Sequence, residues 1–341
     1  MLRSVPVADF LSIDHPIIDV RSPGEFSRAH IPGAHSVPLF SDEERAFVGT
    51  CYKQQGRDQA VLEGLRYVGP RMAWLVEEIA RIASNRSVRI HCWRGGERSA
   101  SVAWLLAKAG FKEVITLTGG YKAFRRHVLQ AFFDPLDLRV VGGFTGTGKT
   151  VLLRELRDSG EQVIDLEALA CHKGSSFGSL GQPLQPTTEQ FENLIWKELI
   201  GLDHARSIWI EDESPMIGKV RIPDGLFTQM RRAPLLFLDL PLEQRAFRLV
   251  EEYGAHSREE LASAITRIAK RLGPQHARAA IQALDENDLV TTAMIALRYY
   301  DKAYLRGLSD RSSNQVLKFP IDGMALPRLI ERLKENVHHY H

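Results

Sequence analysis

The 341-residue sequence contains only three cysteines, at positions 51, 92 and 171. Three scattered cysteines build no disulfide framework and suit no zinc site, so we expect a reducing compartment in which a free thiolate survives. No segment approaches the roughly 18 consecutive apolar residues that a membrane-spanning helix needs. The N-terminus lacks the long apolar core of a signal peptide. We therefore expect a cytoplasmic protein without a membrane partner.

The sequence also lacks a large excess of charge of either sign. Its formal net charge is +2, and its 44% hydrophobic and 25% charged residues are ordinary for a globular protein. Such a balance excludes a surface that attracts nucleic acid everywhere, so any RNA must be held by local basic patches. At roughly 150 residues per domain, the length predicts two domains.

Short apolar runs alternate with helical patterns in both halves of the chain, which predicts two parallel α/β sheets. In the first half we expect strands at 16–20, 87–92 and 113–120, and helices at 69–83, 98–110 and 120–130. In the second half we expect strands at 138–143, 162–166, 206–212 and 234–240, a helix at 150–160, and mostly helix from 244 onward. Pro135 interrupts the pattern within 131–138. We therefore expect domains of 1–132 and 138–341.

The stretch HCWRGGERSAS, residues 91–101, follows an expected strand and precedes an expected helix. Backbone N–H groups in such a loop can surround an anion, and the helix adds its positive end. Arg94 and Arg98 add positive charge, while Gly95 and Gly96 permit a tight curve. This environment favours the thiolate of Cys92, which is a nucleophile. His91, Cys51 and Cys171 are read as structural residues or bystanders.

The segment GFTGTGKT, residues 143–150, matches the phosphate-binding pattern G-x-x-x-x-G-K-[ST] at every fixed position. Gly143, Gly146 and Gly148 let the backbone approach an oxyanion. Lys149 supplies a positive charge, and Thr150 can ligate Mg²⁺. The motif predicts a diphosphate or polyphosphate site and does not by itself predict ATP hydrolysis.

Other polar residues could assist these loops. Glu211 or Asp212 ends the apolar strand IWIED and could assist Mg²⁺, with Asp239 as a rival. The loop HKGSSFG (172–178) could reach a phosphate or RNA, and several basic residues lie at helical spacings. The candidate RNA contacts are Lys173, Ser175, Arg267, Lys270 and Arg271, followed by Arg278, Arg231, Arg232 and the stacking candidates Tyr299 and Tyr300. The histidine-rich end VHHYH (337–341) suits no metal site and is read as a tail.

The run DVRSPGEFSRAHIPGAHSVP, residues 19–38, resembles the signature of rhodanese-like domains, and with the cysteine loop the resemblance covers roughly residues 1–130. It implies a persulfide or perselenide on Cys92. The five residues between Cys92 and Arg98 exceed the loop of ordinary thiosulfate sulfurtransferases and match the phosphatase branch of the same fold. The loop alone therefore leaves both chemistries open.

A rhodanese-like parallel-sheet domain followed by a P-loop NTPase-like α/β domain with a helical C-terminal region resembles the family of bacterial tRNA 2-selenouridine synthases. The resemblance rests on the stretches DVRSPGEF, HIPGA, HCWRGGERS, GFTGTGKT, HKGSSFG, RLGPQ (271–275) and YYDKAY (299–304). The family implies a tRNA substrate bearing 2-thiouridine at the wobble position. Geranyl diphosphate alkylates that sulfur, and selenophosphate then supplies selenium while the geranylthio group leaves.

The resemblance gives each loop a role. Cys92 would carry or deliver selenium, with Arg94, Arg98 and the loop amides around the anionic donor. The P-loop would hold the diphosphate, and Lys149 would stabilise the leaving pyrophosphate. No tightly bound cofactor is implied. Selenophosphate and geranyl diphosphate are co-substrates, and Mg²⁺ could bind through Thr150.

Three other interpretations stay open at the level of the sequence. In an H-C-x5-R phosphatase, Cys92 would form a phosphocysteine and Arg98 would clamp the phosphate. In a P-loop kinase or ATPase, the rhodanese-like half would be a binding module. A protein that only binds RNA would leave both anion-binding loops without a use.

Overall fold

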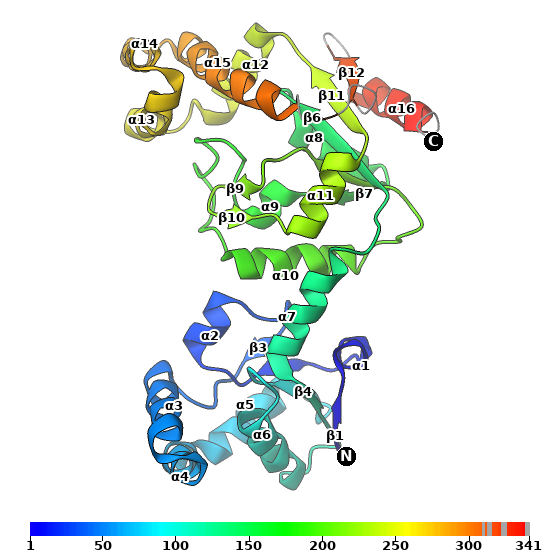
Figure 1. The fold of residues 1–341 in the computed structure, drawn as a ribbon, viewed down its shortest axis with the longest axis vertical. Helices are drawn as coiled ribbons and strands as arrows, with labels where there is room; N and C mark the ends of the chain where they lie inside the picture. Colours follow the sequence, from blue (N-terminus) through cyan, green and yellow to red (C-terminus); the bar gives the residue numbers. More distant parts are fainter. Residues whose placement is uncertain (309–310, 312–315, 322–325, 338–341) are drawn as a thin grey trace. The chain divides into compact units, whose positions relative to one another are not determined.

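The structure, a computed structural model, describes residues 1–308, 311, 316–321 and 326–337 (Figure 1). The chain forms two compact units. Unit 1 comprises Met1–Ala131 together with Glu192–Trp196, and unit 2 comprises Phe132–Phe191 and the described residues from Lys197 onward. Residues 338–341 of the histidine-rich tail lie outside the described residues. The predicted α/β class with parallel sheets and a helical C-terminal region is confirmed.

Unit 1 is built on a parallel five-stranded sheet of order β1-β5-β4-β2-β3. Its strands are β1 (Leu2–Val5), β2 (Ile17–Asp19), β3 (His35–Ser36), β4 (Ser87–His91) and β5 (Glu113–Leu117). Its helices are α1 (Val7–Ser12), α2 (Pro23–Arg28), α3 (Asp42–Gln55), α4 (Arg57–Val68), α5 (Met72–Ile82), α6 (Glu97–Lys108) and α7 (Gly120–Ala131), with a 3₁₀ turn at Gly69–Arg71.

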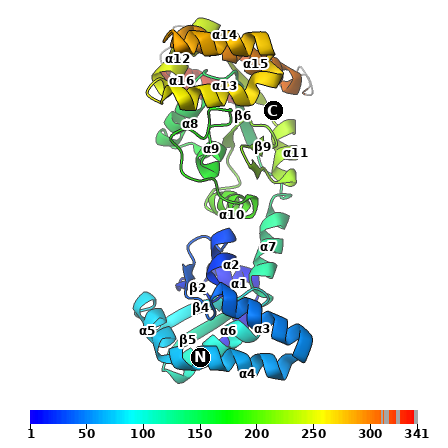
Figure 2. The same cartoon turned by 90° about the vertical axis from the view of Figure 1, so that its left-hand side faces the viewer.

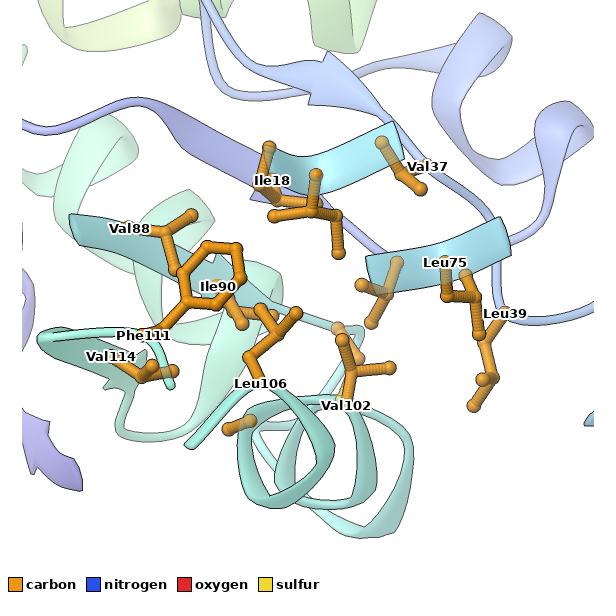
Figure 3. Close-up of a cluster of buried hydrophobic side chains, with 14 of the residues drawn as sticks. Ile18, Val37, Leu39, Leu75, Val88, Ile90, Val102, Leu106, Phe111 and Val114 are labelled. Carbon is orange, nitrogen blue, oxygen red and sulfur yellow. The ribbon is translucent and has the colours of Figure 1, made fainter. Parts of the chain in front are cut away.

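The core of unit 1 lies between this sheet and helices α5 and α6, which precede and follow β4 in the chain (Figure 3). Val88 and Ile90 of β4 and Val102 and Leu106 of α6 are almost completely buried, and they pack with Ile18 of β2. Burying one such side chain contributes about 1.5–3 kcal/mol. This packing fixes the end of β4 against the start of α6, and the cysteine loop joins those two ends.

Unit 2 is built on a second parallel five-stranded sheet, of order β12-β11-β6-β8-β7. Its strands are β6 (Leu138–Gly143), β7 (Gln162–Ile164), β8 (Ile208–Glu211), β11 (Leu235–Asp239) and β12 (Val316–Pro320), and β9 (Met216–Ile217) pairs with β10 (Val220–Arg221) separately. The near-continuous apolar runs of β6, β8 and β11 suit strands that are buried on both faces of a parallel sheet.

The helices of unit 2 extend from the P-loop to the end of the described chain. They are α8 (Lys149–Asp158), α9 (Leu166–Ala170), α11 (Asp224–Arg232), α12 (Leu242–Tyr253), α13 (Arg258–Leu272), α14 (Pro274–Asp285), α15 (Leu289–Leu308) and α16 (Leu326–Val337), and α10 (Thr188–Leu199) contributes residues to both units. Helices α12 to α15 pack on one another as a helical layer (Figure 2).

One part of the expected helical C-terminal region is a strand. Residues Val316–Pro320 pair in parallel with β11, in register from Leu235 to Asp239. The edge position explains why the sequence did not reveal it, because β12 lacks the continuous apolar run of a central strand. In the described part of the chain, no helix combines the length and apolar composition needed to cross a bilayer.

Candidate functional site

The cysteine loop connects β4 to α6 and places its thiol below the loop surface. Cys92 directly follows the strand residue His91, and α6 begins at Glu97 with Gly96 as its N-cap. The Cys92 side chain is only 3% exposed, which is deeper than its polar sequence neighbours suggested. Its Sγ lies 3.2 Å from Ser99 Oγ, and that hydroxyl also donates to Gly96 O at 3.1 Å. A hydroxyl is thus in reach of the sulfur.

Backbone contacts fix the curve of this loop. Gly95 has φ +66°, and a Cβ there would lie 2.5 Å from Leu117 O, so both conformation and space require glycine. From the other side, a Cβ on Gly120 would lie 2.4 Å from Cys92 O. The expectation for Gly96 was wrong: its φ is −102° and a Cβ would meet open space, so the curve does not depend on it.

The two arginines of the loop have different environments. Arg98 Nη1 donates to Glu25 Oε2 at 2.6 Å, and both side chains are largely buried. Burial acts to raise the pKa of Glu25, but the hydrogen bond and charge of Arg98 outweigh it and lower the pKa. Arg94 is exposed. Arg98 is therefore neutralised by a partner, and Arg94 is the cation of the pair that faces solvent.

The Asp-x-Arg run and the histidine before the cysteine form a buried support. Arg21 pairs with Asp19 at 2.6 Å, and its guanidinium lies 3.8 Å from the centre of the Tyr121 ring. His91 is fully buried, with Nε2 3.6 Å from Asp19 Oδ2. Burial lowers the pKa of His91 to about 4, so the ring is neutral at pH 7. This arrangement agrees with a structural histidine.

The P-loop lies between β6 and α8. Gly143, Gly146 and Gly148 have φ of +137°, +83° and +87°, a region that favours glycine, and each would bring a Cβ within 3 Å of a neighbouring atom. Lys149 Nζ donates to Gly143 O at 3.2 Å, so the ammonium reaches back across the loop. The first turn of α8 adds its N–H groups, as anion sites at helix N-termini require.

Helix α12 supplies two arginines that the sequence analysis missed. Arg248 Nη1 donates to Thr147 O at 2.7 Å, beside the start of α8. Arg245 donates to Thr145 O at 3.2 Å and forms a bidentate pair with Asp301 at 2.8 and 2.7 Å. Arg245 therefore braces the loop, while the exposed Arg248 brings a further positive charge to it.

Three carboxylates gather beside the P-loop. Glu167, Glu211 and Glu213 place one oxygen each within 4.8 Å of one another, and Thr150 Oγ1 donates to Glu167 Oε2 at 3.2 Å. Burial raises the pKa of Glu167 to about 7, with the charges of Asp165 and Glu252 adding to the shift, and burial followed by the charge of Glu167 raises the pKa of Glu213 to about 8. The pKa of Glu211 is raised well above its ordinary value for the same reasons.

This cluster fits a magnesium ion. Glu211 is fully buried, and its Oε2 has no hydrogen-bond partner among the described residues. Carboxylate and hydroxyl oxygens are the protein ligands that Mg²⁺ prefers, and a divalent cation would relieve the crowding of three acids. Glu211, Glu167, Glu213 and Thr150 are the residues that would hold it.

The other two acids considered from the sequence have different environments. Asp212 accepts from Tyr304 Oη at 2.7 Å and from Arg311 Nη2 at 2.8 Å, and Tyr304 Oη also accepts from Gly143 N–H at 3.1 Å. Asp212 therefore ties α15 to the strand before the P-loop instead of joining the acid cluster. Asp239 is exposed at the end of β11.

The loop 172–178 packs on the helical layer. Lys173 pairs with Glu252, and Ser175 Oγ accepts from Phe177 N–H at 3.1 Å. Arg267 Nη2 donates to Ser176 O at 2.7 Å. Three of the candidate tRNA contacts, Lys173, Ser175 and Arg267, thus already hold this loop in place.

The remaining candidate tRNA contacts differ in exposure. Lys270, Arg271 and Arg278 have exposed side chains on α13 and α14, and Arg271 also contacts Tyr299 Oη at 3.3 Å. Tyr300 Oη accepts from Ser176 N–H at 2.9 Å, so its hydroxyl is used internally. Arg231 donates to Gly307 O at 2.6 Å and is a structural residue of this region.

The residues that the sequence analysis missed carry only weak local signals. They are Glu167, Glu213, Arg245, Arg248, Ser99 and Tyr304. Glu167 follows the end of β7 and Glu213 follows that of β8, and carboxyl ends of neighbouring parallel strands share one edge of the sheet. This rule could have found the acids. The arginines of α12 lie about one hundred residues from the loop that they contact.

Comparison with known families agrees with this architecture. A model of the rhodanese-like domain matches residues 7–127, and a model described as the tRNA 2-selenouridine synthase AAA domain matches residues 136–322. The chain is therefore a rhodanese-like domain joined to a P-loop domain.

Similar full-length proteins narrow the assignment. A tRNA 2-selenouridine synthase of Sulfurovum sp. (strain NBC37-1) is 35% identical, with 87% of this chain and 90% of that protein covered. One of Aeromonas salmonicida (strain A449) is 34% identical, with 89% and 90% covered. A third, of Shewanella loihica, is 33% identical, with 88% and 90% covered. This chain belongs to the tRNA 2-selenouridine synthase family.

Proposed function

We propose that this protein replaces sulfur by selenium at wobble 2-thiouridine in tRNA, using geranyl diphosphate and selenophosphate in turn. The observation that carries the proposal is the presence of two different anion-binding loops in one chain of this family. One presents the sulfur nucleophile Cys92, and the other is a P-loop with Lys149 across it. An exchange that consumes a diphosphate ester and a phosphate-bound selenium needs both.

The first half of the exchange uses the P-loop. The thiocarbonyl sulfur of the nucleoside attacks C1 of geranyl diphosphate, the C–S bond forms, and the C–O bond breaks with its electron pair leaving on pyrophosphate. The N3 proton of the thiouridine is lost. Lys149 and Arg248 hold the diphosphate and stabilise its growing charge. Mg²⁺ held by Thr150 and the three glutamates would supply further positive charge to the leaving group.

The second half uses the cysteine loop. The Cys92 thiolate attacks phosphorus of selenophosphate, so an S–P bond forms, the P–Se bond breaks and hydrogen selenide leaves. Selenide adds at C2 of the geranylated nucleoside, and geranylthiolate leaves with the electrons of the C–S bond. Water then cleaves the S–P bond and restores the thiol. This route is redox-neutral, whereas a perselenide on Cys92 would need an oxidant.

The two phosphate-bearing co-substrates are assigned to different units, and each unit also has exposed cations. The exposed cations of α13 and α14, with Arg94, are available to tRNA phosphates, whose contacts dominate RNA affinity and make it salt-dependent. Selenophosphate is a co-substrate that must be supplied to this chain. The proposal thus gives a use to each loop and to the exposed basic residues.

One reaction tests this function. The full chain is mixed with 2-thiouridine tRNA, geranyl diphosphate and selenophosphate, and the digested nucleosides are identified by mass spectrometry. We expect 2-selenouridine in the complete mixture and S-geranyl-2-thiouridine when selenophosphate is omitted. Intact tRNA without either nucleoside would contradict the proposal, and turnover of p-nitrophenyl phosphate that depends on Cys92 would then favour a phosphatase.

A further inference from the structure

We propose that an apolar pocket beside the P-loop holds the isoprenoid chain of the diphosphate substrate, and that Leu289 limits the length of that chain. The pocket lies within unit 2 and is formed by α12, α13, α15 and the loop 172–178. It is a partly open pocket with about 60 Å³ of internal space, so a prenyl chain would also occupy its mouth, and its exposed lining is almost entirely apolar. The inference rests on the proposed function, because it places that reaction's prenyl group.

The pocket is continuous with the P-loop. Thr145, within the loop, is part of the pocket lining. Leu249 of α12 also lines the pocket, and its Cγ is 3.3 Å from the place where a Cβ on Gly146 would lie. A diphosphate held by the P-loop therefore has its ester substituent at the entrance to the pocket.

The pocket runs along α15, away from the phosphate site. Tyr304 bonds to Gly143 at the P-loop, and Tyr300, one turn away, lines the pocket. The eleven positions from Tyr300 back to Leu289 correspond to about 16 Å along the helix. Ala293 and Ala296 lie between them and leave room that larger side chains would fill.

The polarity of the wall suits an amphiphile with a charged head and an apolar tail. The polar residues among the lining include Ser175, Tyr253 and Tyr300, and the Tyr300 hydroxyl accepts from Ser176 N–H. Further along α15 the wall is formed by leucines and alanines, and the hydroxyl of Thr292 donates to Asp288 O at 2.8 Å. A purine base needs donors and acceptors at its edges, so this wall suits an isoprenoid better than the base of a nucleotide.

Leu289, the first residue of α15, is the lining residue of that helix that lies farthest from Tyr304 and the P-loop. It contacts the turn at the end of α12, where a Cβ on Gly254 would lie 3.3 Å from Leu289 Cδ1. A chain that extends past Ala293 meets this side chain. Shortening it to alanine removes three carbon atoms and so makes room for part of the five-carbon unit by which farnesyl exceeds geranyl, so Leu289 is the residue that we expect to discriminate between the two diphosphates.

The first test measures binding by calorimetry with geranyl diphosphate and with inorganic pyrophosphate. Ala293→Phe fills the pocket at a partly exposed position, and Ala303→Phe is a matched control at an exposed position of α15 outside the pocket. We expect Ala293→Phe to weaken geranyl diphosphate at least about tenfold, with pyrophosphate unchanged, and the control to change neither. Unchanged geranyl diphosphate affinity in folded Ala293→Phe would overturn the inference.

The second test is Leu289→Ala, which shortens a side chain and avoids overpacking. We expect the ratio of kcat/KM for farnesyl over geranyl diphosphate to rise at least about tenfold. An unchanged ratio would overturn the assigned role of Leu289.

The two proposals fail in different ways. If both variants geranylate tRNA as fast as the wild type and with the same preference for geranyl diphosphate, the pocket assignment fails and the proposed function stands. In the opposite outcome, the wild type binds geranyl diphosphate more tightly than pyrophosphate, loses that preference in Ala293→Phe, and forms no geranylated tRNA. In that case the pocket assignment stands and the proposed function fails.

Discussion

The cysteine loop needs one glycine with positive φ, Gly95, whereas the P-loop needs three. In the cysteine loop, Arg98 is neutralised by Glu25 and the thiol is buried next to a hydroxyl. The P-loop instead gathers charge of both signs, with Lys149 across the loop and a cluster of glutamates beside it. Under the proposed function, the cysteine loop surrounds one reacting atom, whereas the P-loop holds a whole ligand.

Cys92→Ser removes the proposed nucleophile of the cysteine loop and leaves the P-loop intact, and it has the largest expected effect. Because the proposed function makes the Cys92 thiolate the nucleophile toward selenophosphate, we expect 2-selenouridine formation to fall at least about a thousandfold. Geranylation should continue, so S-geranyl-2-thiouridine accumulates and mass spectrometry detects it. Cys171→Ser, in the turn after α9, is the control. Undiminished selenation by Cys92→Ser would refute the nucleophilic role.

Lys149→Ala removes the lysine charge of the P-loop and leaves the cysteine loop intact. The loss of one charge that stabilises the leaving pyrophosphate is expected to slow geranylation about 10²–10³-fold. Selenation of tRNA that has been geranylated beforehand should be unaffected, because the cysteine loop is intact. Single-turnover rates of geranylation and of selenation check this prediction. Equal losses in both rates would show that the two loops do not serve separate steps.

Acid should weaken the support beneath the cysteine loop. His91 has a folded-state pKa of about 4 and an ordinary value of 6.5, so between these values the unfolded chain binds the proton and the folded chain does not. Stability is thus present above pH 6.5 and is lost as the pH falls toward 4, by up to about 3 kcal/mol. The facing groups are Asp19, Arg21 and His30.

Hydrogen exchange of β4 amides measures this loss in the full chain. Asp19 and Arg21 keep opposite charges across this range, so their pair does not produce the same slope. In His91→Asn the protection of β4 should depend much less on pH. An equally steep loss in that variant would assign the effect to another group.

A pair of glycine substitutions sharpens the comparison with the smallest effect. Gly95→Ala places a Cβ against Leu117 O at positive φ and should destabilise unit 1 by about 1–3 kcal/mol. Gly96→Ala meets open space and should change stability by less than about 0.5 kcal/mol. Thermal unfolding compares the two, and equal effects would show that contact with 117–120 does not shape the loop.

The sequence predicted what local patterns encode. The apolar runs predicted β4, β6, β8 and β11, and the glycine spacing predicted the position of the P-loop. The acid cluster, Arg248 and the role of Asp212 depend on side chains that meet across the fold. Arg311, for example, reaches Asp212 from 99 positions away. Gly96 shows that prediction also fails inside a recognised motif, because residue spacing alone does not tell which glycine adopts a positive φ.

The measurement that tests the division of labour most directly is a quenched time course with the full chain. Wild-type protein reacts with 2-thiouridine tRNA, geranyl diphosphate and selenophosphate, and both modified nucleosides are quantified at each time. The account predicts that S-geranyl-2-thiouridine rises first and falls as 2-selenouridine appears, and that omitting geranyl diphosphate prevents both. Formation of 2-selenouridine at the full rate without geranyl diphosphate would contradict the account.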